Sequence, residues 1–391
     1  MKSIRTSLVA ASVVACLSTM MTPVHADKVE RLEATLIRMQ AQMDQIQAEL
    51  AEAKAAARTP RSGGFAEGVS VSGLIDLRAS HTKGYAGAGA EDAAVAEVSV
   101  TMEAALNDWV AGAVTLKAEE GSNNDALAID EALITMDLEP VNIVMGRSSS
   151  VFGALETHMV SDPMTLDLAE TAATMIRLET EHGGFGGGVY VYNGDAKKAG
   201  DDDDELNHYG ADLGYAWASG DVAGSVGVGW ISNVADSGGG ENVVAARRAA
   251  MVHNVPAYTI HGRFETGSFG MVGEYIRANR AFDAAEIAFN GNGAQPSAWN
   301  LEGAYGFESF GVPASFALGL SGTEEAAGFG LAKQRVTGAV AFEMTEGATL
   351  ALEWQRQEDY DSGDAFVNNG GAGSGSGDDQ DTYTVQVAME F

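Results

Sequence analysis

The chain ends on the stretch Thr382-Tyr383-Thr384-Val385-Gln386-Val387-Ala388-Met389-Glu390-Phe391, and this stretch decides the fold. Apolar side chains occupy every second position from Tyr383 to Phe391, and mostly polar ones fill the positions between them. Successive side chains on a β-strand point to opposite faces. The alternation therefore predicts a strand with one apolar and one polar face.

The same two-residue rhythm starts after Gly68 and continues through the chain. In the segment 69–80, four apolar side chains share one face, and Leu74 is the exception on the polar face. Apolar positions elsewhere, such as Val98, Val100 and Val336, repeat the pattern. We expect sixteen such strands, at 69–80, 93–106, 109–120, 127–138, 141–147, 173–180, 184–193, 206–217, 221–232, 255–265, 269–277, 297–307, 312–322, 332–343, 348–358 and 381–391.

The connections between these segments alternate in length. Tight turns, such as Asn107-Asp108 and Glu346-Gly347, alternate with longer and mostly polar loops at 81–92, 121–126, 148–172, 194–205, 233–254, 278–296, 323–331 and 359–380. Short periplasmic turns and longer extracellular loops are typical of outer-membrane barrels, whereas a soluble β-sandwich has no reason to alternate in this way. The predicted fold is all-β: a 16-stranded antiparallel transmembrane β-barrel over residues 69–391, in the outer membrane of a Gram-negative bacterium.

Three parts are predicted before the barrel. Residues 1–26 have the basic start, apolar stretch and small-residue end of a signal peptide; lipoprotein processing at Cys16, the one cysteine of the chain, is the alternative. Residues 27–58 contain no Gly or Pro, and their apolar residues recur at a 3-4 spacing, which predicts a coiled coil. Residues 59–68 form a linker. An even strand number places this helix in the periplasm, where we expect it to self-associate as a homotrimer, with a dimer or a lone amphipathic helix as alternatives.

The charged residues indicate what the barrel encloses. The net charge of −32 argues against nucleic acid as a partner. Charges on the barrel strands fall opposite the apolar positions, and basic residues on the lipid face cost about 2–4 kcal/mol at the bilayer midplane. We therefore expect a charged pore wall and, at this strand number, an aqueous channel that prefers cations because acids outnumber bases. The expected wall residues are Asp76, Arg78, Glu97, Glu103, Lys117, Glu119, Glu131, Arg177, Glu179, Arg263, Glu265, Lys333, Arg335, Glu343 and Glu353.

The loop 148–172, the third of the long loops, contains more apolar residues than a solvated loop needs. A loop folded into the barrel would pack these residues on the wall while its polar groups face the channel. We therefore expect a pore constriction here, by analogy with trimeric porins; the alternative is an outer loop that packs on its neighbours. The candidate constriction residues are Glu156, His158, Asp162, Asp167 and Glu170.

Two stretches resemble a known family. Gly146-Arg147-Ser148, followed by Phe152-Gly153 and by the run from Thr157 to Thr171, is similar to the signature of the LbtU-type siderophore porins, as is the segment from Gly187 to Asp195. The resemblance implies an outer-membrane barrel that takes part in the uptake of a ferric siderophore. A coiled coil before a barrel also resembles the DcaP-like trimeric porins, which take up small anionic solutes. About 40 residues between leader and barrel leave no room for a plug domain, so we expect transport without TonB.

The sequence gives weaker support to other functions and ligands than to a channel. A barrel enzyme, either lipase or protease, would need a nucleophile, a histidine and an acid together at the rim or on the lipid face, and the alternation shows no such group. The acidic run 201–205 has the oxygen ligands of a Ca²⁺ or Mg²⁺ site, but runs of this kind are usually solvated. No cofactor is expected, and the expected partners are outer-membrane lipid, lipopolysaccharide and a small solute. His158 and His261 are the candidate histidines for a ligand or a proton switch. Gly363 and the stretch 370–377 are expected to form a flexible, low-complexity outer loop.

Overall fold

The computed structural model describes residues 69–391 apart from 86, 88, 121–126, 149–150, 197, 199–205, 239–250 and 369–370. The predicted signal peptide, coiled coil and linker, and the acidic run 201–205, lie outside the described residues. Residues from Gly68 to Phe391 form one compact unit. No helix in the described ranges is long and apolar enough to cross a membrane.

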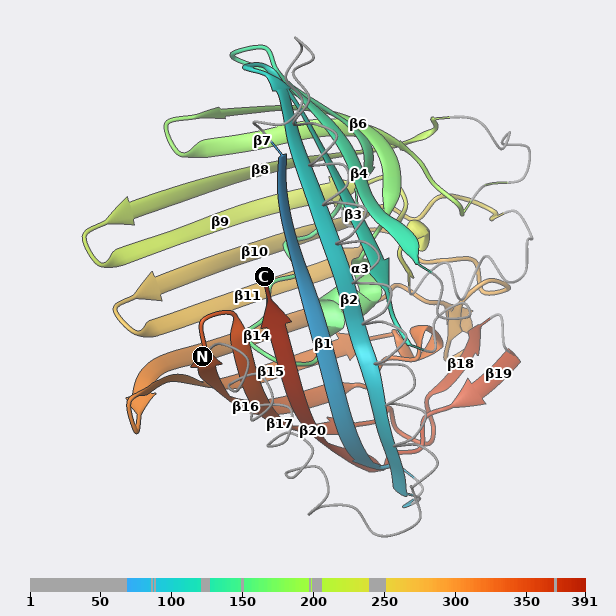
Figure 1. Cartoon of the computed structure of the whole chain (residues 1–391). Coiled ribbons are helices and arrows are strands. Elements are labelled where there is room, and N and C mark those ends of the chain that lie inside the picture. Colours follow the sequence, from blue (N-terminus) through green and yellow to red (C-terminus); the bar gives the residue numbers. More distant parts are fainter. Residues whose placement is uncertain are drawn as a thin grey trace. The chain divides into compact units, whose positions relative to one another are not determined.

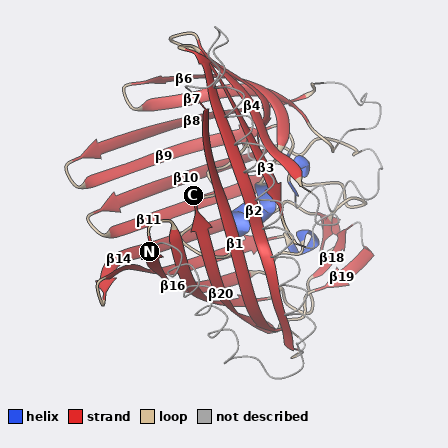
Figure 2. Ribbon diagram, in the orientation of Figure 1, coloured by secondary structure: helices blue, strands red, loops and turns tan. Residues whose placement is uncertain are grey.

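This unit is a closed barrel of sixteen antiparallel strands in which each strand pairs with the next and β20 closes on β1 (Figure 1; Figure 2). The barrel strands are β1(Val69–Lys83), β2(Gly89–Asn107), β3(Val110–Ala118), β4(Ala128–Asp137), β5(Asn142–Ser148), β6(Ala173–His182), β7(Phe185–Asn193), β8(His208–Ser219), β9(Val222–Ile231), β10(Ala257–Thr266), β11(Phe269–Ala278), β14(Ser297–Ser309), β15(Val312–Glu324), β16(Gln334–Thr345), β17(Ala348–Glu358) and β20(Asp379–Glu390). Each corresponds to one predicted segment, so the predicted barrel is confirmed. The largest difference in a strand start is at β2, which begins at Gly89 instead of 93.

The register confirms which residues share a face. Directly paired residues of antiparallel strands point to the same side. Ile75 pairs with Val98 and Met389, and these apolar side chains belong to the outer face. Asp76 pairs with Glu97 and belongs to the inner face. A β-bulge after Asp76 inserts one extra residue in β2.

The long loops contain structure that the sequence did not indicate. β12(Ala288–Phe289), β13(Asn292–Gly293), β18(Ala365–Asn368) and β19(Gly371–Ser374) form a separate four-stranded sheet. β19 falls in the glycine-rich stretch 370–377, which we expected to be a flexible loop, so that expectation was wrong for the residues of β19. Two hydrogen bonds of the Asn290 side chain join the two loops that form this sheet: its amide donates to the Asp364 carboxylate, and its Oδ1 atom accepts the backbone N–H of Ala365. Phe289 also packs on Tyr360.

The apolar core lies where the third loop, the neighbouring strand ends and the long loops meet. It combines third-loop residues such as Phe152 and Leu168 with strand residues such as Ile231 and Ile276 and with loop residues such as Ile287. Apolar side chains thus fill part of the space inside the barrel wall, and the third loop is one of the parts that they hold in place.

Candidate functional site

The third loop turns inward after β5 and lies against the inner wall of the barrel. Its short helix α3(Met164–Ala169) contacts β11, β14 and β15, and Figure 1 shows the helix within the ring of strands. Val151, Phe152, Val160 and Leu168 are buried, so the apolar residues of the loop pack on the wall. Gly153 has a φ of +91°, a left-handed conformation that glycine adopts without strain.

Three buried wall carboxylates hold the loop, and we call them the carboxylate ladder: Glu274 on β11, Glu302 on β14 and Glu353 on β17. Glu274 accepts the backbone N–H groups of Ala154 and Leu155 at 2.9 and 3.0 Å. Burying a charge without hydrogen-bond partners is costly. The loop supplies the donors that this buried carboxylate needs.

The other two rungs repeat this arrangement. Glu302 accepts the Thr157 hydroxyl at 2.8 Å and the backbone N–H of His158. Glu353 accepts the backbone N–H groups of Val160 and Ser161 at 2.6 and 3.2 Å. The donor pairs thus recur every three residues along the loop.

The spacing of the ladder shows that the loop runs across the strands. β11 and β17 are four strand spacings apart in the barrel order, which is about 19 Å at about 4.8 Å per spacing. Six residues of extended chain, from 154 to 160, cover about 20 Å. The loop therefore crosses this part of the wall in an extended conformation before α3 begins.

Beyond the ladder, β16 and β17 hold the turn into α3. Arg335 donates to the backbone carbonyl of Asp162 at 2.7 Å, and its guanidinium lies 3.7 Å from the Asp167 carboxylate. Gln355 donates to the Ser161 hydroxyl at 3.0 Å. Since Arg263 of β10 also bonds Glu156, the segment 154–167 is bonded to five of the barrel strands.

The candidate constriction residues are all on this loop but differ in their surroundings. Glu156 is exposed and lies 3.4 Å from Arg263, and the side chain of Asp162 is exposed. Burial raises the pKa of Asp167 to about 6, Arg335 lowers it and Asp162 raises it. Burial also raises the pKa of Glu170. The Nε2 atom of His158 is buried and has no hydrogen-bond partner in the described part of the chain.

The inward-facing bases of the wall are paired with acids. Lys117 lies 3.4 Å from Glu97 and 2.8 Å from Glu119, and Arg78 lies 2.7 Å from Asp76. Arg177 lies between Glu179 at 2.8 Å and Asp212 at 2.6 Å.

Further expected wall residues lie on the inner face of the barrel strands, whereas Lys333 lies just before β16 and bonds Asp361 of the following long loop. Arg263 bonds Glu265 and Glu156. Glu131 pairs with Thr115, whose hydroxyl bonds Thr101. Glu343 pairs with Thr349. Lys117, Arg177 and Arg263 each lie between two acids. Acids therefore outnumber bases, and the described inner surface is acidic.

The inward-facing acids missing from the expected wall include Asp212, Glu274 and Glu302. Each lies inside a predicted strand, opposite apolar positions, so the alternation that identified the other wall residues also applies to them. Their pairing with Arg177 or with the third loop has no signal in the sequence.

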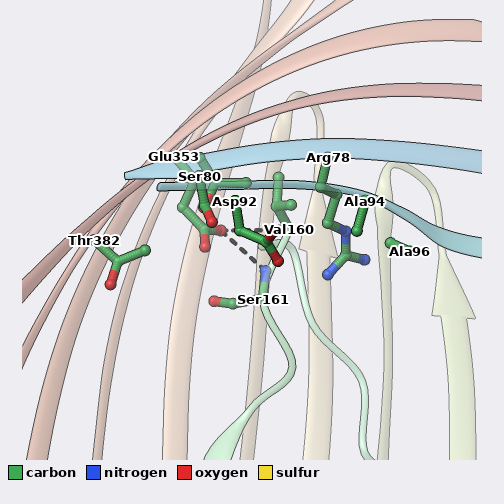
Figure 3. Close-up of a pocket in the computed structure, with 10 residues that line it drawn as sticks. Arg78, Ser80, Asp92, Ala94, Ala96, Val160, Ser161, Glu353 and Thr382 are labelled. Atoms are coloured by element: carbon green, nitrogen blue, oxygen red, sulfur yellow. Dashed lines mark hydrogen bonds between the residues drawn. The ribbon is translucent and has the colours of Figure 1, made fainter. Parts of the chain in front are cut away.

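A cavity of about 260 Å³ lies between the third loop and the inner wall of β1, β2 and β20. Figure 3 shows Arg78 on one side of it, Asp92 and Glu353 toward the other, and Ser161 of the loop below them. In the described ranges no group of three or more His, Cys, Asp or Glu could hold a metal ion. The lining of the cavity is therefore charged and polar.

Comparisons with known proteins agree with this geometry. Among solved structures, the anion-selective porin from Comamonas acidovorans superposes with a TM-score of 0.57 at 12% identity, over 83% of this chain and 99% of the porin. The outer-membrane channel DcaP of Acinetobacter baumannii superposes with a TM-score of 0.55 at 14% identity, over 85% of this chain and 100% of that one. The chain has the fold of outer-membrane porins.

The chain is also similar in sequence to UPF0422 proteins. A UPF0422 protein of Coxiella burnetii is 26% identical over 301 residues, 74% of this chain and 64% of the relative. A UPF0422 protein of Legionella pneumophila is 25% identical over 320 residues, 75% of this chain and 59% of the relative. The chain thus matches less than two thirds of the length of these relatives. No protein-family model matches it.

Proposed function

We propose that this chain forms a water-filled channel for small solutes across the outer membrane, with the third loop as its constriction. The observation that carries the proposal is the loop itself, which the carboxylate ladder holds against the inner wall of a closed 16-stranded barrel. Barrels of about 16 to 18 strands are wide enough for an aqueous channel. An inward loop bonded to the wall narrows such a channel while leaving its other side open.

The charges support a preference for cations. Acids outnumber bases on the described inner surface, and a channel lined by one sign of charge concentrates the opposite ion. The porin from Comamonas acidovorans is described as anion-selective, so the shared fold and the expected selectivity are separate properties. Glu156, Asp162 and Asp167 extend the acidic surface onto the loop.

Conductance in planar lipid bilayers tests both parts of this proposal. Under a KCl gradient we expect stepwise channel openings and a reversal potential with the same sign as the K⁺ equilibrium potential. A reversal potential of the sign set by Cl⁻ contradicts the cation preference, and a refolded barrel without conductance contradicts the channel. Turnover of lipid or peptide substrates would favour the alternative of a barrel enzyme.

A narrower proposal is the uptake of a ferric siderophore without TonB. It is supported by the resemblance of residues 146–195 to the LbtU-type porins, and these residues are β5, the third loop, β6 and β7. Growth of a deletion strain under iron limitation, with and without added siderophores, tests it. We expect slower growth that the intact gene restores; equal growth of both strains with every siderophore contradicts the proposal.

We also propose a homotrimer, and the aromatic residues support one sector of the barrel as its interface. β1 to β6 contain no Trp, Tyr or Phe, whereas every barrel strand from β7 onward contains at least one, such as Trp230, Trp299 and Trp354. Aromatic girdles mark the lipid-facing surface of outer-membrane barrels. The outer face of β1 to β6, six of the sixteen strands, is therefore proposed to face other protomers instead of lipid. The OmpT porin of Vibrio cholerae described as a trimer form has the same fold, with a TM-score of 0.53.

A further inference from the structure

The cavity beside Arg78 has oppositely charged sides, which the general acidity of the channel does not explain. Resting on the channel function proposed above, we infer that this cavity is a selectivity site for small solutes that carry both an ammonium and a carboxylate group, such as free amino acids. Its volume of about 260 Å³ is below the range of about 300–1,000 Å³ typical of drug-sized ligands. It suits a solute of amino-acid size.

Arg78 supplies the positive side of the cavity. It is the one cation among the lining residues. Its Nε and Nη2 atoms both donate to a single oxygen of Asp76, at 2.9 and 2.7 Å. Its Nη1 atom has no hydrogen-bond partner among the described residues, and the side chain is 34% exposed. A solute carboxylate can therefore bond Nη1 without displacing Asp76.

The other inward bases are engaged more fully. Lys117 and Arg177 each face two acids, and all three guanidinium nitrogens of Arg177 donate hydrogen bonds. Arg335 is 11% exposed and bonded to the third loop. Arg263 is 47% exposed, but all three of its guanidinium nitrogens already donate to Glu265 or Glu156. Arg78 is thus better placed than these bases to bind an anionic group from the channel.

Hydroxyl groups and acids complete the cavity. Ser80 and Thr384 are direct partners across β1 and β20, and both line the cavity with Ser161 and Thr382. The Ser161 hydroxyl accepts a hydrogen bond from Gln355, so its own proton is available to a solute carboxylate. Asp92 and Glu353 provide the negative side (Figure 3).

The two sides favour a zwitterion over either ion alone. A purely anionic solute must cross an acidic channel before it reaches Arg78, and like charges repel it there. A cation meets acids along the whole wall and gains nothing from Arg78. A solute with both groups keeps a net charge near zero and gains charge-assisted hydrogen bonds at both ends.

Osmotic swelling of proteoliposomes tests the inference. The probes are alanine and lactamide, which have nearly the same size but differ in charge. We expect alanine to enter faster than lactamide, by about tenfold for a gain at the lower end of one hydrogen bond to a charged group. In Arg78→Gln the ratio of the two rates should fall to about one while the lactamide rate persists.

Matched variants and a second measurement separate the outcomes. Arg356→Gln is the control, because Arg356 is 47% exposed, faces outward next to Asp381 and should leave the ratio unchanged. If Arg78→Gln does not fold, Arg78→Lys, which keeps the charge but not the spare nitrogen, should give a reduced ratio. Equal rates for alanine and lactamide in the wild-type protein, with normal KCl conductance, overturn this inference and leave the channel intact. Absence of KCl conductance overturns the channel itself.

Discussion

Glu302 is the middle rung of the carboxylate ladder and 2% exposed. A carboxylate buried to this degree is stable only where hydrogen bonds satisfy its oxygens. Its Oε1 atom accepts both the Thr157 hydroxyl and the Asn300 amide, and its Oε2 atom accepts the backbone of His158. The side chain therefore fixes the middle of the loop to β14.

Replacing Glu302 by Gln places an amide NH₂ group against one of these donors. Because a hydrogen bond to a charged group contributes about 1.5–3 kcal/mol, we expect the free energy of unfolding in urea to fall by a similar amount and the open-channel current to become noisier. Glu308→Gln is the matched control, since Glu308 lies on the same strand, faces inward and is exposed. Equal effects of both substitutions would contradict a positioning role for the ladder.

Asp167 gives the constriction a pH dependence near neutrality. Burial raises the pKa of this carboxyl to about 6, so it is charged at pH 7.5 and neutral at pH 5. Lowering the pH through about 6 removes a negative charge from the loop, and the ratio of K⁺ to Cl⁻ permeability should fall. Reversal potentials recorded from pH 7.5 to pH 5 measure this change.

The variants for this titration differ in their expected curves. In Asp167→Asn the step near pH 6 should be reduced, because the charge is absent throughout. Asp162→Asn should keep a step but move it to lower pH, because Asp162 raises the pKa of Asp167. An unchanged step in Asp167→Asn would assign the titration to another group, such as Glu170.

For single residues, the sequence predicted which face of the barrel a side chain occupies better than it predicted the hydrogen-bond partners of that side chain. The alternation placed Arg177 and Glu353 on the inner face, and their pairings agree. It could not show that Glu353 accepts hydrogen bonds from Val160 and Ser161, because these residues are almost 200 positions apart and the loop between them follows no period. Partners of this kind depend on where a loop reaches in the folded chain.

At the scale of elements, the sixteen barrel strands were predictable because each must turn one apolar face outward over its whole length. The small sheet of β12, β13, β18 and β19 was not. β12 and β13 have two residues each, too few to show an alternation, and β19 reads Gly-Ala-Gly-Ser. Their pairing joins loops about 75 residues apart and depends on contacts such as Phe289 on Tyr360.

The aromatic-free sector from β1 to β6 leads to a prediction about assembly. Cys16, the one cysteine, lies in the predicted signal peptide, so a single cysteine can be introduced into the processed chain without a competing thiol. Val100→Cys on the outer face of β2 should give covalent oligomers with a short thiol-reactive crosslinker in native outer membranes. Val228→Cys on β9, a lipid-facing position that is 48% exposed, is the control and should stay monomeric on denaturing gels. Crosslinking at Val228 alone would place the interface in the aromatic sector instead.

At the scale of the whole molecule, the charge of the chain and the shape of the barrel act together. The chain carries 55 acidic and 23 basic residues, and the register turns many of the acids toward the lumen. A charge on the outer rim is exposed to bulk salt, whereas a charge inside a narrow passage acts on every ion that crosses. The selectivity should therefore depend on which face an acid occupies more than on the total charge.

Ionic strength tests this last point. Screening lengths fall from about 10 Å at 0.1 M salt to about 3 Å at 1 M, so the K⁺ preference should be strong in dilute KCl and weaker in concentrated KCl. Neutralising the inward-facing pair Glu103 and Glu343 by glutamine should reduce the preference at 0.1 M and change it little at 1 M. Glu324→Gln removes an exposed acid from the outward face of β15 and should leave the reversal potential unchanged at both concentrations. If Glu324→Gln reduced the preference as much as the inward pair, the selectivity would arise at the rim and the third loop would not be its main determinant.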